Sequence, residues 1–296
     1  MADRILVVND EEVCCEIISS MLTSAGYQCW TASDGLDALA VLNSGEEFEL
    51  LIANLNMPSL DGIGLLIRTK EQFPDVPVVI ETATNYVYFA LEAIRNGAYD
   101  YIVGHFEREQ LLIVVRRALE YRRLKLANRD YEKRLGTLTI PTAHEPKRIL
   151  VQDDEETIRE IVSSMLISSH YECRAVASPK EALDILSSGE QFDLILCGLL
   201  ETLEDNFFKR MGEQFPDIPL VVLSACHGFS MFSPALRDGA YDYLMKPFER
   251  EQLIFAVRRA LECRRLKLEN REYKARLEKL ARISAERRSA SDLQGR

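Results

Sequence analysis

The feature that most constrains this chain is an internal duplication. The run GAYDYIVGHFEREQLLIVVRRALE that begins at Gly97 is matched by GAYDYLMKPFEREQLIFAVRRALE at Gly239. Shorter matches precede it, GEEFELLIANL against GEQFDLILCGL and EQFPDVPVV against EQFPDIPLV. The copies lie about 140 residues apart, which is too long for a solenoid repeat and suits a duplicated domain. The sequence therefore predicts one domain written twice.

The length of 296 residues suffices for two domains that each bury a core. We predict the first domain over residues 1–135 and the second over residues 147–280, each with an extended terminal helix. Gly136, Pro141 and Pro146 interrupt the helical pattern, so residues 136–146 predict a linker. The arginine-rich residues 281–296 predict a basic, flexible tail.

Composition excludes several classes of protein. A formal net charge of -11 argues against general affinity for nucleic acid or anionic membranes. No secretory signal pattern and no apolar stretch long enough to span a bilayer occur, so we expect a cytoplasmic protein with no membrane partner. The seven cysteines form no C-x-x-C pair. Free thiols are therefore favoured over a disulfide or zinc framework.

Short apolar runs alternate with helical patterns in each copy. The runs of the first copy predict strands over residues 5–8, 27–32, 48–53, 77–81 and 99–103. Between the first two strands, an apolar stripe at helical spacing comprises Val13, Ile17, Met21 and Leu22. Alternating strands and helices form right-handed βαβ crossovers and an open parallel sheet with both faces covered. A site in such a sheet lies at the carboxyl ends of the strands.

The residues at those predicted ends differ between the copies. In the first copy they are Asn9, Asp10, Asn54, Thr82, Gly104 and His105. In the second copy they are Asp153, Asp154, Gly198, Ser224, Lys246 and Pro247.

These ends, with the motifs ILVVNDEE, NMPSLDG and GAYDYLMKPFE, resemble the receiver domain of bacterial two-component response regulators, over nearly the whole of both copies. The resemblance implies two flavodoxin-like, doubly wound α/β domains with five parallel strands in the order 2-1-3-4-5. In that family an acidic pair and an aspartate hold Mg²⁺, and the aspartate attacks a phosphoryl group beside a lysine. A hydroxyl and an aromatic side chain then respond to the phosphorylated state. The resemblance also implies a cis bond between Lys246 and Pro247.

Both copies depart from that pattern at the phosphoacceptor. The acceptor position holds Asn54 in the first copy, where Asn9 and Gly104 also replace an acid and the lysine. It holds Gly198 in the second copy, which keeps its acidic pair and lysine. The switch hydroxyls and aromatics that remain are Thr82, Tyr101, Ser224 and Tyr243. We therefore predict two pseudo-receivers without catalytic residues, while a shifted register or an alternative acceptor at Asp61 or Asp205 stays open.

The remnant acidic pockets predict little metal binding. Asp10 is the only clear carboxylate of the first pair, so no cofactor is expected there. In the second copy, Asp153 and Asp154 beside Lys246 predict either a structural acid–lysine pair or a weak Mg²⁺ site. Glu81 is a further charge inside a predicted strand, where the second copy has Leu223.

Two surfaces are candidates for protein contact. After the fourth strand of each copy, aromatic and apolar side chains predict an exposed docking patch or side chains folded inward: Tyr86, Tyr88, Phe89, Phe229, Met231 and Phe232. The terminal helices carry apolar residues at heptad-like spacing, each row with an asparagine that would set register in a two-stranded coil: Leu124, Asn128, Tyr131 and Leu135, and Leu266, Asn270, Tyr273, Leu277 and Leu280. This seam predicts pairing in a homodimer or between the copies, or else one long helix packed on its own domain.

The sequence thus predicts a tandem pseudo-receiver that acts in phosphorelay signalling through protein contacts, with a histidine kinase or another signalling protein as partner. One alternative is a phosphorylated regulator with a non-standard acceptor. Another is a nucleic-acid-binding regulator that uses the basic terminal helix, and salt-dependent binding would reveal it. An independent enzyme is not expected, because no nucleophile–base pair or glycine-rich phosphate loop occurs.

Overall fold

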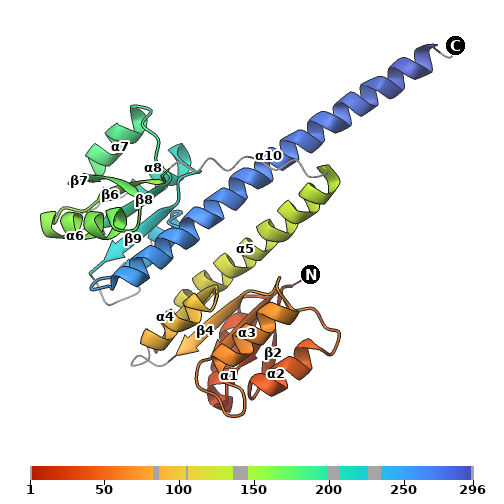
Figure 1. Ribbon diagram of the computed structural model, residues 1–296, viewed down its shortest axis with the longest axis vertical. Helices are drawn as coiled ribbons and strands as arrows, with labels where there is room; N and C mark the ends of the chain where they lie inside the picture. Colours follow the sequence, from red (N-terminus) through yellow and green to blue (C-terminus); the bar gives the residue numbers. More distant parts are fainter. Residues whose placement is uncertain are drawn as a thin grey trace. The chain divides into compact units, whose positions relative to one another are not determined.

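The chain forms two compact units, Met1–Leu126 and Ala127–Arg296. The computed structural model describes residues 2–82, 87–104, 106–135, 146–198, 207–225 and 235–294. The boundary falls inside the long helix α5, so the last turns of that helix belong to the second unit (Figure 1). Residues 136–145 of the predicted linker lie outside the described residues, and the predicted domain bounds stay predictions.

The first unit holds a five-stranded parallel sheet in the order β2-β1-β3-β4-β5. Its elements are β1 (Arg4–Val8), α1 (Glu12–Thr23), β2 (Gln28–Ala32), α2 (Gly35–Leu42), β3 (Leu50–Asn54), α3 (Gly62–Gln72), β4 (Val78–Thr82), α4 (Val87–Arg95), β5 (Asp100–Val103) and α5 (Arg108–Leu135). Parallel neighbours joined through helices are the doubly wound arrangement that the alternating pattern predicted.

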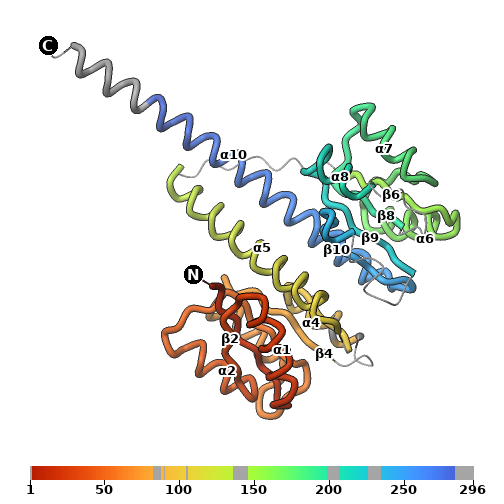
Figure 2. Tube along the Cα trace, turned by 180° about the vertical axis from the view of Figure 1, so that it is seen from behind, coloured from red at the N-terminus to blue at the C-terminus, as the bar shows by residue number. Residues whose placement is uncertain are grey.

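The second unit repeats this topology, with strand order β10-β9-β8-β6-β7. Its described elements are β6 (Arg148–Gln152), α6 (Glu156–Ile167), β7 (Glu172–Val176), α7 (Pro179–Ser187), β8 (Leu194–Gly198), α8 (Phe207–Gln214), β9 (Leu220–Ser224), β10 (Asp242–Met245) and α10 (Arg250–Gln294). Figure 2 traces the blue part of α10 as one uninterrupted helix. The predicted fold class is confirmed for both copies.

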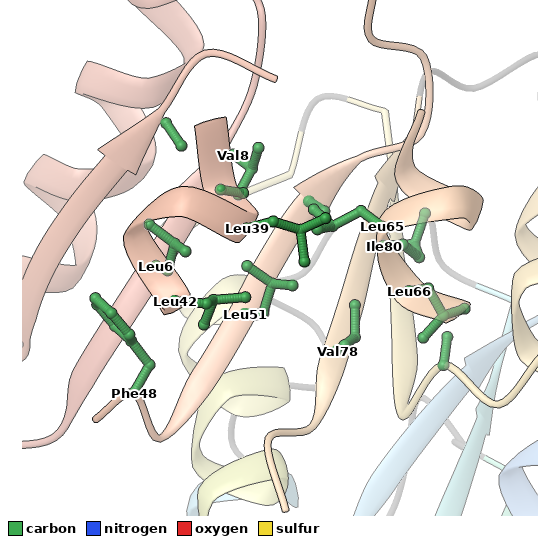
Figure 3. Close-up of a cluster of buried hydrophobic side chains, with 14 of the residues drawn as sticks. Leu6, Val8, Leu39, Leu42, Phe48, Leu51, Leu65, Leu66, Val78 and Ile80 are labelled. Carbon is green, nitrogen blue, oxygen red and sulfur yellow. The ribbon is translucent and has the colours of Figure 1, made fainter. Parts of the chain in front are cut away.

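Strand alternation builds a core on each face of the first sheet. In β1, Leu6 and Val8 point into one buried cluster, whereas Ile5 and Val7 point into the other. Figure 3 shows the first cluster, in which strand side chains meet leucines of α2 and α3. All four of these β1 side chains are almost completely buried, so β1 is apolar on both faces, as a central parallel strand requires.

The buried face of α1 differs from the predicted stripe. Cys15, Ile18 and Leu22 are buried, while Val13 and Ile17 are exposed. The predicted helix is present, but α1 carries apolar residues on more than one face, and their spacing alone does not say which face meets the sheet.

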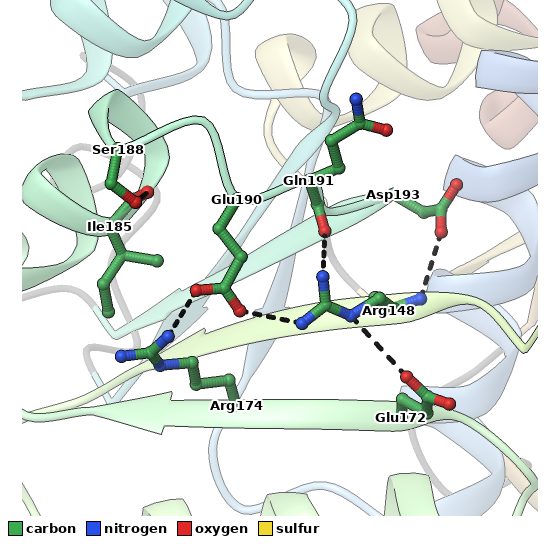
Figure 4. A network of polar contacts seen from close by, with 8 residues as sticks. All are labelled: Arg148, Glu172, Arg174, Ile185, Ser188, Glu190, Gln191 and Asp193. Carbon is green, nitrogen blue, oxygen red and sulfur yellow. Dashed lines mark hydrogen bonds and ion pairs between the residues drawn. The ribbon is translucent and has the colours of Figure 1, made fainter.

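A network of ion pairs lies at the amino ends of β6 and β7, opposite the candidate site. Arg148 donates to Glu190 at 2.7 Å and to the Gln191 carbonyl at 2.9 Å, and its backbone NH donates to Asp193 at 3.0 Å (Figure 4). Arg264 of α10 reaches the same Asp193 at 2.8 Å. The terminal helix is thereby attached to the amino-terminal edge of its own sheet.

A buried ion pair joins the last strand of each sheet to its terminal helix. Arg117 of α5 donates to Asp100 of β5 at 2.8 Å, and both side chains are buried. Arg259 of α10 pairs with Asp242 of β10 in the same way.

Among the described residues, no helix is both long enough and apolar enough to cross a membrane.

Candidate functional site

The first candidate site lies where β1, β3 and β4 end. Asn9 follows β1, Asn54 closes β3 and Thr82 closes β4. The ladder holds these ends together, because Val8 of β1 pairs with Ala53 of β3, and the backbone NH of Leu55 donates to the Glu81 carbonyl of β4 at 2.8 Å. Parallel strands bring their carboxyl ends to one edge of the sheet, so residues far apart in sequence meet there.

Asn54 occupies the acceptor position as a hydrogen-bond donor. Its Nδ2 donates to Asp10 Oδ1 at 3.1 Å and to the Asn56 carbonyl at 3.0 Å. A longer contact of 3.5 Å reaches Asn9 Oδ1. The amide therefore presents N–H groups toward the remaining acid of the pair, where a receiver with an acceptor would present a carboxylate.

Glu81 is a member of this site that the sequence did not explain. The β3–β4 register places Asn54 beside Glu81, and Asn9 Nδ2 donates to Glu81 Oε2 at 3.2 Å. Burial raises the pKa of the Glu81 carboxyl, and the nearby acids Glu11 and Asp10 raise it further. The signal that could have found it is the difference between the copies, since Leu223 stands at the matching place.

The acids of the first site have no basic partner among the described residues. Gly104 stands at the lysine position with φ of 68°, a backbone conformation that a lysine would adopt only with strain. In the part of the chain that the structure describes, no lysine or arginine forms an ion pair with Asp10, Glu11 or Glu81. Residue His105 lies outside the described residues. The described part of the first site is therefore acidic, and the raised pKa of Glu81 favours the neutral form of that carboxyl.

The second site keeps its lysine and directs it to the acidic pair. Lys246 Nζ lies 2.7 Å from Asp153 Oδ2, and the backbone NH of Glu155 donates to Asp153 Oδ1 at 3.1 Å. The Asp153 side chain is 1% exposed, whereas Asp154 is exposed. The Lys246–Pro247 peptide bond is cis, as the resemblance implied. Both oxygens of the buried carboxylate are thus engaged within the protein.

Asp153 also fills the space beside Gly198. A Cβ atom at Gly198 would lie 2.4 Å from Asp153 Oδ2 and 2.7 Å from its Cγ, distances far inside van der Waals contact. Among the described residues, Asp153 therefore occupies the space that a side chain at position 198 would need. The Asp153 carboxylate, at the end of the neighbouring strand β6, lies over the predicted acceptor position and has Lys246 as its partner.

The remaining carboxylates of both sites have partners within the protein. Among the described residues, no group of three His, Cys, Asp or Glu side chains is arranged to hold a metal ion. In the first site the acceptor position supplies an amide that donates to Asp10, and in the second Asp153 is bound by Lys246. Mg²⁺ is usually held by one or two carboxylates together with water and phosphate oxygens, so little metal binding at either site stays a prediction.

The four predicted switch residues lie on the last two strands of each sheet. Thr82 and Ser224 are fully buried at the ends of β4 and β9. Tyr101 and Tyr243 are partly buried and pack against the cores of their units. Asp61, one alternative acceptor, instead caps α3 by accepting from the Gly64 amide at 2.7 Å.

The predicted docking patch is described only in part. Tyr88 and Phe89 of α4 are 69% and 42% exposed, and their rings meet edge to face with centroids 5.8 Å apart. The other members of the patch lie outside the described residues, namely Tyr86, Phe229, Met231 and Phe232. Asp205, the second alternative acceptor, also lies outside them. For the two described aromatics, the structure favours an exposed patch over inward packing.

Comparison with known proteins agrees with this geometry. The sequence model described as the response regulator receiver domain matches residues 5–116 and 149–258. Response regulator protein FleR from Pseudomonas aeruginosa is 38% identical over 120 residues, which are 40% of this chain and 25% of that protein. Nitrogen assimilation regulatory protein NtrX from Azorhizobium caulinodans is 31% identical over 163 residues, or 54% of this chain and 35% of that protein.

A solved structure is also similar. The receiver domain of NtrX from Brucella abortus is 36% identical, with 39% of this chain and 98% of that domain covered and a TM-score of 0.38. The chain spans only a quarter to about a third of the length of the two curated relatives named above. Since the family match covers most of the residues and falls on both sheets, the chain belongs to the response regulator receiver domain family and carries that domain twice.

Proposed function

We propose that the chain is a tandem pseudo-receiver that takes part in two-component signalling in the cytoplasm through protein–protein contacts. In this role it undergoes no aspartyl phosphorylation and has no enzymatic activity of its own. The observation that carries the proposal is the occupation of the two acceptor positions by Asn54 and Gly198.

The first site lacks both nucleophile and electrostatic support. Phosphoryl transfer to a carboxylate requires an anionic oxygen and cations that neutralise the incoming phosphoryl charge. Asn54 is a neutral amide whose nitrogen donates to Asp10. Glu81 and Glu11 add negative charge near the place where a phosphoryl group would arrive. The neutral amide and the added negative charge both oppose phosphorylation.

The second site lacks the nucleophile, and its lysine is already paired with an aspartate. Lys246 neutralises Asp153 within the protein, and Gly198 has no side chain. Asp153 is not a substitute nucleophile, because it is almost completely buried and both of its oxygens accept hydrogen bonds. This arrangement supports a structural role for the acid–lysine pair.

Protein contact is the remaining way for such domains to act. The exposed pair Tyr88 and Phe89 lies on α4, and exposed aromatic side chains are frequent anchors in protein interfaces. We propose a signalling protein, such as a histidine kinase, as the partner of this surface. The terminal helices are a second contact surface, within one chain or between two.

The test is intact mass after incubation with Mg²⁺ and a small-molecule phosphodonor, beside a competent receiver. We expect no phosphoryl adduct on this chain and a stoichiometric adduct on the competent receiver. An acid-stable, base-labile adduct would overturn the proposal, and mapping it would identify the acceptor. The variant Asn54→Asp is a matched control that restores a carboxylate alone. We expect it to stay largely unmodified, because no lysine accompanies it.

A further inference from the structure

The C-terminal parts of α5 and α10 are nearly the same sequence. Residues 122–135 and 264–277 differ at only four of fourteen aligned positions. In the alignment of the two stretches, the differences are Ala127 against Glu269, Asp130 against Glu272, Glu132 against Lys274 and Lys133 against Ala275. Each stretch carries an asparagine between leucines and a tyrosine at coiled-coil spacing. Two such helices have three potential pairings: α5 with α10, or either helix with its copy in a second chain.

Within the second unit, Asn128 lies in a buried polar contact with α10. It is 4% exposed, its Nδ2 donates to the Leu266 carbonyl at 3.0 Å, and its Oδ1 accepts from Asn270 Nδ2 at 2.9 Å. Nδ2 also approaches Glu269 Oε2 at 3.4 Å. A buried amide needs such partners, and a shifted register would take them away. The asparagine pair therefore selects one register.

One turn further along, a second contact distinguishes the two helices. Tyr273 is 3% exposed, and its hydroxyl donates to Glu132 Oε1 at 2.7 Å. Burial raises the pKa of Tyr273 to about 12, with the hydrogen bond to Glu132 as the next cause. The rings of Tyr131 and Tyr273 lie 6.4 Å apart. Residue numbers rise together along both helices, so the contact is parallel.

We propose that residues 127–135 of α5 are the partner of the α10 seam in the same chain, in a parallel two-helix coil. Asn128 and Asn270 set its register, and Glu132 selects α5 over a second copy of α10. In a pair of α10 helices, Lys274 would stand where Glu132 stands, and the buried Tyr273 hydroxyl would lose its carboxylate acceptor.

Tethering favours the same choice. The two helices belong to one chain, and only the short stretch 136–146 follows α5 before the second domain begins. Linked segments meet at an effective concentration in the millimolar range, about a thousand times above the micromolar concentration of a second chain. The near-identity of the helices thus serves an internal pairing.

The decisive experiment is a cross-link that reports which chain each helix came from. Labelled and unlabelled chains of the variant Asn128→Cys with Asn270→Cys are mixed unfolded, refolded and mildly oxidised, and the linked peptides are identified by mass. We expect a 128–270 link with both peptides carrying the same label. Links of mixed label, a 270–270 link or no link at either position would overturn the proposal. The control pair Asp130→Cys with Lys274→Cys places thiols on exposed positions and should link far less.

A second measurement tests the role of Glu132 without disturbing the asparagines. Glu132→Lys should lower the pKa of Tyr273 toward its ordinary value of 10.0, because the hydrogen bond and the negative charge that favour the protonated hydroxyl are both removed. Glu132→Gln keeps an acceptor but removes the charge, so it should lower this pKa less, and Tyr273→Phe identifies the tyrosine in the titration. An unchanged tyrosine titration in Glu132→Lys would contradict the proposed selection.

Discussion

At the carboxyl end of β4, Glu81 is a partly buried acid where the second copy has Leu223. Asn9, itself the replacement of an acid, donates to it. Where the second site has the acid–lysine pair of Asp153 and Lys246, the first site has the amide–acid pair of Asn9 and Glu81. The acid of the first pair has no lysine as partner, and its pKa is raised.

The raised pKa gives a prediction for stability. A carboxyl with a higher pKa in the folded state binds protons more tightly there, so the first unit loses stability as pH rises from about 4.5 through the folded pKa of Glu81. Glu81→Gln removes this loss and keeps an acceptor for Asn9. We expect urea unfolding to show a more stable first unit at pH 7 and no gain at about pH 4, below the ordinary pKa of a glutamate.

A gain for Glu81→Gln that is equal at both pH values would contradict this explanation. The exposed substitution Glu16→Gln on α1 is the control for a general effect of lowering the net negative charge. It should leave the pH profile unchanged, because that side chain gains no buried partner.

At the second site, Gly198→Ala tests whether Asp153 fills the acceptor space. The added Cβ would meet Asp153 Oδ2 at 2.4 Å, and Asp153 is held by Lys246, so the pair must shift. Overpacking of this kind typically costs about 1–3 kcal/mol of unfolding free energy. Chemical denaturation should show this loss in the second unit.

The matched control for that substitution is Gly212→Ala in α8. Its Cβ would meet only the Asp238 carbonyl at 3.4 Å, and alanine favours helix over glycine. We expect unchanged or higher stability there. Equal losses at Gly198 and Gly212 would show that the clash with Asp153 is not the cause.

Among the elements, the terminal helices are each attached to their sheet by a buried ion pair and by a hydrogen bond to a loop carbonyl. The buried Arg117–Asp100 pair fixes α5 to β5, and Arg122 Nε donates to the Asp75 carbonyl at 3.0 Å. The second unit repeats both contacts through Arg259 and Arg264. Each helix thereby keeps one orientation on its sheet while its C-terminal turns extend beyond it.

Arg117→Met should be strongly destabilising for the first unit. Removing one partner of a buried ion pair leaves the other charge without its counter-ion, which typically costs about 3–5 kcal/mol. Thermal or urea unfolding measures the loss. Arg116→Met, next to it and exposed, is the control and should change stability by less than about 0.5 kcal/mol. A similar loss for both variants would argue for a general helix effect.

At the scale of the whole molecule, each unit has its own sheet and its own buried clusters. Leu51 and Ile80 belong to the clusters of the first unit, and Leu196 and Val222 to those of the second. Independent cores lead to separately cooperative unfolding when few contacts are shared.

We therefore expect two unfolding transitions that respond to different variants. Glu81→Gln should move only the transition of the first unit, and Gly198→Ala only that of the second. Hydrogen exchange on each sheet would assign the transitions. A single transition displaced equally by both substitutions would show that the units unfold together.

The sequence by itself determined the duplication and the parallel sheets, and it carries the prediction that both acceptors are lost. Duplication is visible as repeated letters, and alternation of apolar runs with helical patterns leaves few topologies. Asn54 and Gly198 could be placed because the apolar runs before them fix the strand ends. These properties are local in the chain, so residue order is enough to read them.

Only the tertiary structure decided which groups meet. It brought Glu81 to Asn9 across two strands, placed Asp153 over Gly198, and chose Ile18 instead of Ile17 as the buried face of α1. Each outcome depends on register, side-chain direction and free volume between segments far apart in sequence. Such quantities are set by packing, and the linear pattern of residues does not contain them.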